Sequence, residues 1–219
     1  MDKKSLRIIE QVTKLYGRYG IKSVTMDDAA HYLGISKKTL YEHFQDKEEL
    51  VRNVILLEYE KHDRNLEEIR KRDLNALQEL FEVYRILFGM FRDYNPAISY
   101  DTRKYYPELF NSLREVRRKK MMSSTLRNIK KGKKEGLFRQ DLDVDIISKL
   151  HIFHIENLFE NDLFTQDEIS SFKIFHEIFV YHLNGMLSEK GKKYFDRNFK
   201  TFKHSVEIPV LKEETGQIS

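Results

Sequence analysis

The segment TMDDAAHYLGISKKTLYEHFQDKEE, residues 25–49, is the most informative part of the sequence. It predicts three helix starts in close succession, and two of them have the form of a capping box. Thr25 is followed three residues later by Asp28, and Asp46 is followed in the same way by Glu49. In this pattern a side-chain oxygen accepts hydrogen bonds from free amides of the first turn, and an acid suits the positive end of the helix dipole.

The middle helix start breaks the rule that the other two obey. Ser36 is expected to cap this helix, but Lys37 and Lys38 follow it in the first turn. A cation at the positive end of a helix dipole is unfavourable by roughly 0.3–1 kcal/mol at an exposed site. The two lysines are explained if an anion from outside the protein meets this helix end, and DNA phosphate is the anion that we expect.

Two short helices joined by a glycine turn surround this position. The first is expected over Met26–Leu33, and Gly34 supplies the left-handed residue that closes it. In the second helix Leu40 and Phe44 stand four residues apart and form one apolar stripe, while the opposite face is polar. This arrangement is typical of a helix-turn-helix.

A longer series of residues carries a resemblance to a known family. The residues are Ile9, Tyr16, Gly20-Ile21, Thr25-Met26-Asp27-Asp28-Ala29-Ala30, Leu33-Gly34-Ile35-Ser36, Thr39-Leu40-Tyr41, His43-Phe44 and Asp46-Lys47-Glu48-Glu49-Leu50. In this order they resemble the DNA-binding domain of the TetR family of bacterial transcription regulators. Beyond residue 50, only the helical layout and the segment GLFRQDLD at 136–143 are similar to the family.

The resemblance implies an all-α fold with two domains. We expect an amino-terminal three-helix DNA-binding domain with the helix-turn-helix over residues 1–47. A larger helical domain for ligand binding and dimerisation should follow over residues 48–205, with a frayed tail at 206–219. The partners implied are double-stranded operator DNA, a second copy of the chain and a small-molecule effector.

The resemblance also implies a set of DNA-binding residues. Most family members have a small residue where Lys38 stands, so that position departs from the pattern. We expect side chains of the recognition helix to enter the major groove or its edge, and the starts of the flanking helices to hold the phosphate backbone. The predicted contacts are Thr25, Ser36, Lys37, Lys38, Thr39, Tyr41, His43 and Lys47.

Composition agrees with a helical protein that lacks disulfides. The 219 residues include three prolines, nine glycines and no cysteine, which excludes disulfides, thiolate zinc sites and cysteine nucleophiles. The net charge is only +4, so a DNA-binding surface must come from the placement of charges. Neither a signal peptide nor an apolar run of ~18 residues is apparent, which predicts a cytoplasmic protein without a membrane partner.

The rest of the chain predicts a series of helices. Asn95-Pro96 is expected to end one helix, Pro107 to open another, and Gly136 to close it. The expected ranges are 47–70, a helix capped by Asp73, then 97–104, 107–135, 143–161, 165–187 with a capping box at Thr165 and Glu168, and 191–204.

The last two long helices carry more apolar surface than one buried face needs, which favours a dimer. The resemblance implies that they pair with the same helices of a second subunit in a four-helix bundle. Packing within the monomer would explain some of these residues, although not all. The predicted interface consists of Ile146, Phe153, Ile174, Phe175, Ile178, Phe179 and His182.

The resemblance further implies an effector pocket in the second domain. Aromatic and methionine rows at helical spacing are more often ordinary core, so this assignment rests on the family rather than on the pattern. The predicted lining consists of Tyr84, Phe88, Phe91, Tyr105, Phe110, Arg117, Met121, Met122, Thr125 and His154. The expected effector is mostly apolar or aromatic.

The basic run from Arg117 to Lys120 allows three interpretations. Four consecutive cations cover most of a helix circumference, so at least one must turn toward neighbouring residues. Snorkelling or ion pairing is the favoured explanation. An acid group of the effector is the second, and an additional DNA contact is the third.

Catalysis finds no support in the sequence. His151, His154 and Glu156 have metal-like spacing on one helix, but a fourth ligand is not apparent, and histidines at an interface or pocket are commoner. No phosphate loop, nucleophile elbow or catalytic carboxylate pair occurs. We therefore expect no enzyme, no metal and no cofactor. The favoured function is a ligand-released repressor, and the alternative is a DNA-binding or protein-interaction module without an effector.

Overall fold

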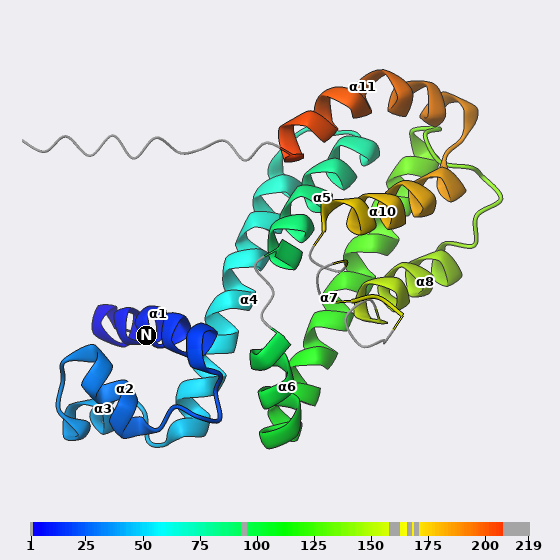
Figure 1. The fold of residues 1–219 in the computed structure, drawn as a ribbon. Coiled ribbons are helices and arrows are strands. Elements are labelled where there is room, and N and C mark those ends of the chain that lie inside the picture. The colour runs from blue at the N-terminus through cyan, green and yellow to red at the C-terminus, as the bar shows by residue number, and fades with distance from the viewer. Residues whose placement is uncertain (1, 93–95, 158–162, 166–167, 169–170, 208–219) are drawn as a thin grey trace, which may run out of the picture. The chain divides into compact units, whose positions relative to one another are not determined.

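The computed structural model describes residues 2–92, 96–157, 163–165, 168 and 171–207, and the described chain is built from helices (Figure 1). The helices are α1 Lys3–Tyr19, α2 Met26–Leu33, α3 Lys37–His43, α4 Lys47–Lys71, α5 Ala76–Arg92, α6 Pro96–Tyr105, α7 Pro107–Lys134, α8 Val144–Asn157, α10 Phe172–Met186 and α11 Glu189–Glu207. The all-α prediction is confirmed. Within the described ranges, no helix has both the length and the apolar character that a membrane span requires.

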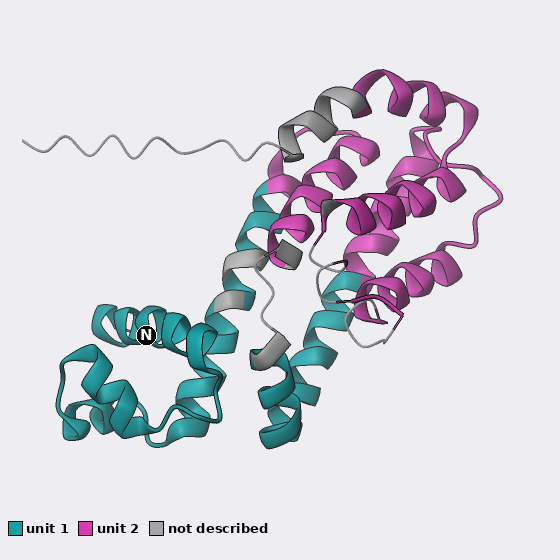
Figure 2. Cartoon of the chain, in the orientation of Figure 1, with its two compact units in different colours: residues 1–68, 93–121 teal, residues 69–92, 122–219 magenta. Residues whose placement is uncertain are grey.

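The chain divides into two compact units, each discontinuous in sequence (Figure 2). Unit 1 comprises residues 1–68 and 93–121, and unit 2 comprises residues 69–92 and 122–219. Helix α6 and the first half of α7 therefore belong with the helix-turn-helix. Helices α4 and α7 each begin in unit 1 and end in unit 2. The predicted domain boundaries at residues 47 and 205 stay predictions.

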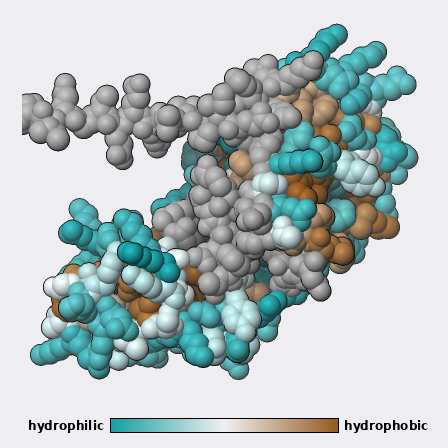
Figure 3. Space-filling view, in the orientation of Figure 1, coloured by the Kyte–Doolittle hydropathy of each residue, from teal (hydrophilic) through white to brown (hydrophobic). Residues whose placement is uncertain are grey.

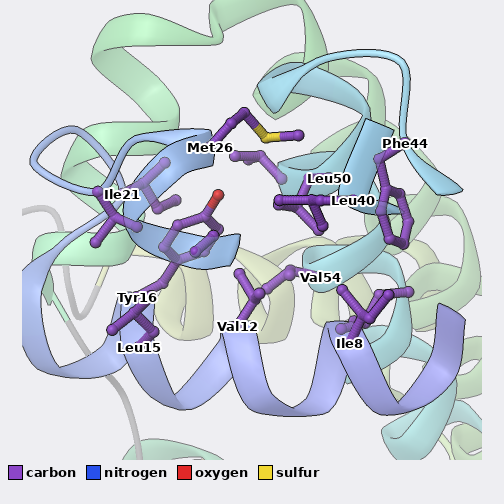
Figure 4. Close-up of a cluster of buried hydrophobic side chains, with 14 of the residues drawn as sticks. Ile8, Val12, Leu15, Tyr16, Ile21, Met26, Leu40, Phe44, Leu50 and Val54 are labelled. Atoms are coloured by element: carbon purple, nitrogen blue, oxygen red, sulfur yellow. The ribbon is translucent and has the colours of Figure 1, made fainter. Parts of the chain in front are cut away.

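Unit 1 is organised around one buried apolar cluster (Figure 4). Val12 and Tyr16 of α1 point into it, and Leu40 of α3 and Leu50 of α4 meet them there. Each of these side chains is almost fully buried, and burial of a large apolar side chain contributes about 1.5–3 kcal/mol. The polar face of α3 is thereby turned outward by the packing of its apolar stripe.

Unit 2 has a core in which α5, α7, α10 and α11 meet. Leu77 and Phe81 of α5 pack in one cluster with Ile129 of α7, Leu183 of α10 and Phe195 of α11. The rings of Phe81 and Phe195 have centroids 6.1 Å apart. The apolar faces of these helices therefore pack largely against one another within unit 2.

A close crossing in unit 2 joins the segment after α7 to the junction of α10 and α11. The Arg139 amide donates to the Met186 carbonyl at 2.9 Å, and the Ser188 amide donates to the Leu137 carbonyl at 3.0 Å. Gly191 lies so close that a Cβ built on it would overlap the carbonyl oxygen of Leu137. The absence of a side chain at this position is what allows the backbones to approach.

Two predicted helix starts were wrong. Helix α5 is capped by Asn75 and not by Asp73, because Asn75 and Gln78 exchange reciprocal hydrogen bonds of 2.9 Å between amides and side chains. The long helix expected from Thr165 is not continuous from that residue, because Ser171 precedes a new helix start at Phe172. Thr165 and Glu168 do form their box, but Ser171 has an extended backbone and caps α10 instead. The predicted end of α8 at residue 161 lies outside the described residues.

Candidate nucleic-acid interface and the second unit

The helix-turn-helix forms as its local signals predicted. The Asp28 amide donates to the Thr25 hydroxyl at 3.1 Å, and the Thr25 amide donates to the Asp28 carboxylate at 2.8 Å. Hydrogen bonds from the Thr25 hydroxyl and amide lower the pKa of the Asp28 carboxyl. Gly34 ends α2 in the left-handed conformation, with φ of +65°. The Ser36 hydroxyl then accepts from the Thr39 amide at 3.0 Å and starts α3.

The two lysines in the first turn of α3 differ in their surroundings. Lys37 forms an ion pair with Asp27 of α2, with Nζ and Oδ1 2.7 Å apart. Its unfavourable position on the helix dipole is therefore offset within the chain. The Lys38 side chain is exposed. The argument for an external anion at this helix end consequently depends on Lys38 more than on Lys37.

Lys47, predicted to bind phosphate, also braces the fold. Its ammonium donates to the carbonyl oxygen of Lys22, 3.2 Å away in the turn that follows α1. Partial burial lowers the pKa of the Lys47 ammonium, while Asp101 and Asp28 oppose that shift. Lys47 thus connects the turn between α1 and α2 to the start of α4.

Helix α6 contacts the same turn, which the sequence did not indicate. The Lys22 amide donates to the Asp101 carboxylate at 2.8 Å, across 79 residues of chain. Tyr105 was predicted to line the effector pocket, but it is exposed and its ring centroid lies 4.9 Å from the Lys22 ammonium. The sequence could not indicate this role of Asp101, because its hydrogen-bond partner is a backbone amide, which every residue except proline has.

The other predicted DNA contacts lie on the outer side of α3. Tyr41 is exposed and Thr39 is half-buried, and both belong to the helix whose apolar stripe faces the core. His43, at the end of α3, is half-buried and adjoins the first residues of α1. The predicted contacts of α3 thus lie outside its buried position at Leu40, and their role toward DNA stays a prediction.

The predicted pocket residues are divided between the two units, and the pocket stays a prediction. Phe110, Arg117 and Met121 belong to unit 1, as does Tyr105, whereas unit 2 contains Tyr84, Phe88, Met122, Thr125 and His154. The side chain of Phe91 lies outside the described residues. An aromatic cluster in unit 2 joins Tyr84 and Phe88 to two residues predicted for the dimer interface. Tyr84 lies 4.7 Å from Phe175 and 4.1 Å from Phe179 between ring centroids.

Lys119 and Lys120 of the basic run on α7 form ion pairs. Lys119 pairs with Glu115 one turn earlier at 2.7 Å, and Lys120 pairs with Asp63 of α4. Pairing with Lys119 lowers the pKa of the Glu115 carboxyl. Arg117 and Arg118 also take part in polar or electrostatic contacts. These contacts agree with the favoured interpretation of the run, which is snorkelling or ion pairing.

The predicted dimer residues separate into an exposed and an internal group. Ile146 and Phe153 of α8 are 54% and 59% exposed, whereas Phe175 is buried in unit 2. Ile174, Ile178, Phe179 and His182 are half-buried. Leu150 on α8 and Tyr181 on α10 are also exposed, and Figure 3 shows hydrophobic surface over these two helices. Leu150 and Tyr181 were not among the predicted interface residues.

Three histidines meet beside this surface. The rings of His151 and His182 have centroids 4.6 Å apart, and those of His154 and His182 are 6.3 Å apart. Burial, reinforced by the neighbouring imidazoles, lowers the pKa of His151 from 6.5 to about 3. Burial and His154 lower that of His182 to about 4. Among the described residues, no group of three or more histidine or carboxylate side chains is arranged so that it could hold a metal ion.

We expect these depressed pKa values to destabilise the fold in mild acid. Above pH 6.5 both rings are neutral in the folded and unfolded states. As pH falls toward 4, the unfolded chain takes up two protons that the folded chain excludes, so the free energy of unfolding falls by roughly 1.4 kcal/mol per proton and pH unit. Urea unfolding at pH 7 and pH 5 should show this loss. A His151→Gln/His182→Gln variant should show much less of it, whereas the exposed control His31→Gln should behave as the wild type.

The geometry of α2, Gly34 and α3 defines a class of protein. A short helix with a buried stripe and an exposed polar face, set by a tight turn against a preceding helix, is the element that helix-turn-helix proteins insert in the major groove of DNA. The protein is accordingly a helix-turn-helix DNA-binding protein.

Comparison with known proteins narrows this class to a family. Residues 8–54 match the model of the bacterial regulatory proteins of the tetR family. The chain is 26% identical over 144 residues to the HTH-type transcriptional repressor KstR2 of Mycolicibacterium smegmatis, covering 64% of this chain and 70% of that protein. Residues 8–54 of this chain thus carry a DNA-binding domain of the tetR family.

Solved structures share the whole fold. The ketosteroid transcriptional regulator KstR2 of Mycobacterium tuberculosis superposes with a TM-score of 0.61 at 20% identity, over 86% of this chain and 97% of that chain. A transcriptional regulator from Saccharomonospora viridis in complex with choline superposes with a TM-score of 0.68 at 20% identity, over 86% of this chain and all of that chain. The amino-terminal helix-turn-helix and the larger helical remainder are thus common to all three.

Proposed function

We propose that this protein is a transcriptional repressor that binds a palindromic operator as a homodimer and leaves it when a small molecule binds. The observation that carries the proposal is the outward polar face of α3, held by the buried Leu40 and by the Ser36 cap. One helix of seven residues reads few base pairs, so selective binding requires a second copy related by a two-fold axis. Such a regulator acts in the cytoplasm, where bacterial DNA lies.

Dimerisation is supported by the apolar surface of α8 and α10. Ile146, Leu150 and Phe153 follow one another at intervals of four and three residues, which places them on one face of α8. Together with Tyr181 they leave large apolar side chains exposed on two helices of one unit. Contiguous apolar patches of this kind mark interaction sites, and we assign this one to a second copy of the chain.

An effector is supported by the relatives and by the aromatic cluster of unit 2. One relative of the same fold is described as a ketosteroid regulator, and another was solved with choline. The rings of Tyr84, Phe88 and Phe175 form an apolar, aromatic cluster in unit 2. We therefore propose a mostly apolar or aromatic effector that binds in this unit.

Release from DNA follows from the continuity of α4. This helix starts beside the helix-turn-helix at Lys47, and its last residues, from Ile69, belong to unit 2. A ligand that shifts α4 would change the separation of the two recognition helices, which must match half-sites at multiples of about 34 Å. A coupling of roughly 1–3 kcal/mol would weaken DNA binding about 5- to 150-fold, and DNA would weaken ligand binding by the same factor.

The experiment that tests this function starts with an in vitro selection of DNA by the full-length protein. The proposal expects a palindromic consensus, and its affinity should fall when the effector is added from a panel of metabolites. Selection of a consensus that no small molecule affects would favour the alternative, a DNA-binding module without an effector. Failure to select any consensus would overturn the proposal.

Replacing Lys47 with alanine should weaken binding to all DNA sequences alike and flatten the salt dependence. A lost phosphate contact lowers the slope of log affinity against log salt by about one unit. Fluorescence anisotropy at several salt concentrations measures this slope. Lys149→Ala, which removes an exposed lysine of unit 2, is the matched control and should leave the slope unchanged. If the slope of log affinity against log salt is unaltered in Lys47→Ala, Lys47 does not bind phosphate, and its role is the structural hydrogen bond to Lys22.

A further inference from the structure

A chain of hydrogen bonds runs from the first residues of α1 to the end of the recognition helix. Asp2 caps α1, and its Oδ1 accepts from the amides of Lys4 and Ser5 at 2.7 and 2.8 Å. Its Oδ2 accepts from the Ser5 hydroxyl at 3.0 Å. The same hydroxyl oxygen lies 2.9 Å from Nδ1 of His43. Ser5 is buried although it belongs to the first turn of its helix.

The direction of these hydrogen bonds follows from the number of hydrogens. An ionised carboxylate can only accept, and a serine hydroxyl has one hydrogen to donate. Hydrogen bonds from the Ser5 amide and hydroxyl lower the pKa of the Asp2 carboxyl, so Asp2 is ionised at neutral pH. The Ser5 hydrogen is then directed to Asp2, and its oxygen is left to accept from His43. Nδ1 of His43 must therefore carry a hydrogen.

A neutral imidazole that is protonated on Nδ1 has its lone pair on Nε2. On Nε2 it can accept a hydrogen bond but cannot donate one. A phosphate oxygen has no hydrogen to give and cannot pair with this nitrogen. In the major groove, the hydrogens available to an acceptor belong to the exocyclic amino groups of adenine N6 and cytosine N4.

We propose that Asp2 and Ser5 are positioning residues that hold His43 in the Nδ1-protonated form, so that its Nε2 accepts a hydrogen bond from a base amino group in the operator. The inference rests on the proposed function, because it assigns the chemistry of one contact within that DNA interface. It makes position 43 a residue that selects a base and not one that clamps the backbone.

The tautomer can be tested on the full-length protein without DNA. Long-range nitrogen–proton NMR spectra of protein labelled with ¹⁵N-histidine distinguish the two neutral forms, and a His43→Gln variant assigns the signals. The wild type should show His43 protonated on Nδ1 at a pH where the ring is neutral. Ser5→Ala should shift the proton to Nε2, the form that free histidine prefers, and Ser5→Thr should restore Nδ1 protonation. A wild-type ring protonated on Nε2 would overturn the proposal.

The base contact is tested by repeating the DNA selection with Ser5→Ala and Ser5→Thr. One position of each half-site should lose its base preference by roughly tenfold or more in Ser5→Ala, and Ser5→Thr should keep it. Replacing the selected adenine by purine, which removes only the amino group, should weaken the wild type and not Ser5→Ala. Equal weakening of all sequences by Ser5→Ala would overturn the base contact while leaving the regulator intact. Absence of any consensus for the wild type would instead remove the proposed function, and the base contact with it, whatever the NMR result.

Discussion

Replacing Phe153 with glutamate is expected to convert the proposed homodimer into monomers and to abolish binding to the proposed operator. Phe153 is the most exposed of the apolar residues on α8, and the two-fold axis of a dimer would place the new carboxylate in the interface twice. An unpaired charge in an apolar interface costs roughly 3–5 kcal/mol, which corresponds to about a 10²- to 4 × 10³-fold weaker association. Sedimentation velocity measures the oligomeric state, and fluorescence anisotropy measures operator affinity.

The choice of Phe153 follows from the packing of α10. Phe179 is equally apolar, but its ring contacts Tyr84 within unit 2, so a glutamate there would disturb the fold as well as the interface. Val116→Glu is the matched control, since Val116 is 53% exposed on α7 within unit 1. This control should remain dimeric and bind DNA. A wild type that is monomeric at micromolar concentration, or a Phe153→Glu variant that still dimerises, would exclude this face as the interface.

The substitution Gly191→Ala, which adds a single methyl group, should destabilise unit 2. The new Cβ would overlap the carbonyl oxygen of Leu137, which already accepts from the Ser188 amide. A backbone atom cannot rotate away as a side chain can, so the helix start of α11 must move. Overpacking of this kind costs about 1–3 kcal/mol or more, and for a chain of this size each kcal/mol lowers the melting temperature by roughly 2–4 °C. Thermal unfolding followed by circular dichroism measures the shift.

Gly89→Ala provides the control for this substitution. Gly89 lies within α5, and a Cβ there meets no atom within 4 Å. Alanine is favoured over glycine in a helix by about 1 kcal/mol, so Gly89→Ala should raise the melting temperature slightly. The same substitution of glycine by alanine is thus expected to lower the melting temperature at Gly191 and to raise it at Gly89. Equal melting temperatures for both variants would contradict the close crossing at Gly191.

The parts of the fold that the sequence predicted are those set by neighbouring residues. The capping box of Thr25 and the left-handed Gly34 involve atoms a few residues apart, and the pattern of side chains alone indicates them. Contacts across the fold leave no such pattern. The bond from Lys22 to Asp101 spans 79 residues and the bond from Ser5 to His43 spans 38, and neither could be inferred from spacing.

The dimer prediction shows a second limit of sequence reasoning. Helical periodicity identifies which side of a helix is apolar, but it does not say whether that side faces the same chain or another. Phe175 and Phe153 fit the same pattern, yet Phe175 is buried in unit 2 and Phe153 is exposed. Local sequence also overestimated the length of the last long helix, because Thr165 and Ser171 are both good caps and the second one starts α10.

Because unit 1 is discontinuous in sequence, it limits how the DNA-binding part of one regulator can be joined to the ligand-binding part of another. Leu109 and Leu113 of α7 are buried in the same cluster as Val12 and Leu40, although they lie far beyond the residues that match the family model. A chimaera joined after residue 54 would inherit the DNA-reading helices without these two leucines. It would carry an open apolar site on its DNA-binding half unless the incoming sensor supplied side chains of similar shape. A functional exchange therefore has to match the chain at two places, the junction after residue 54 and the part of α7 that contains Leu109 and Leu113.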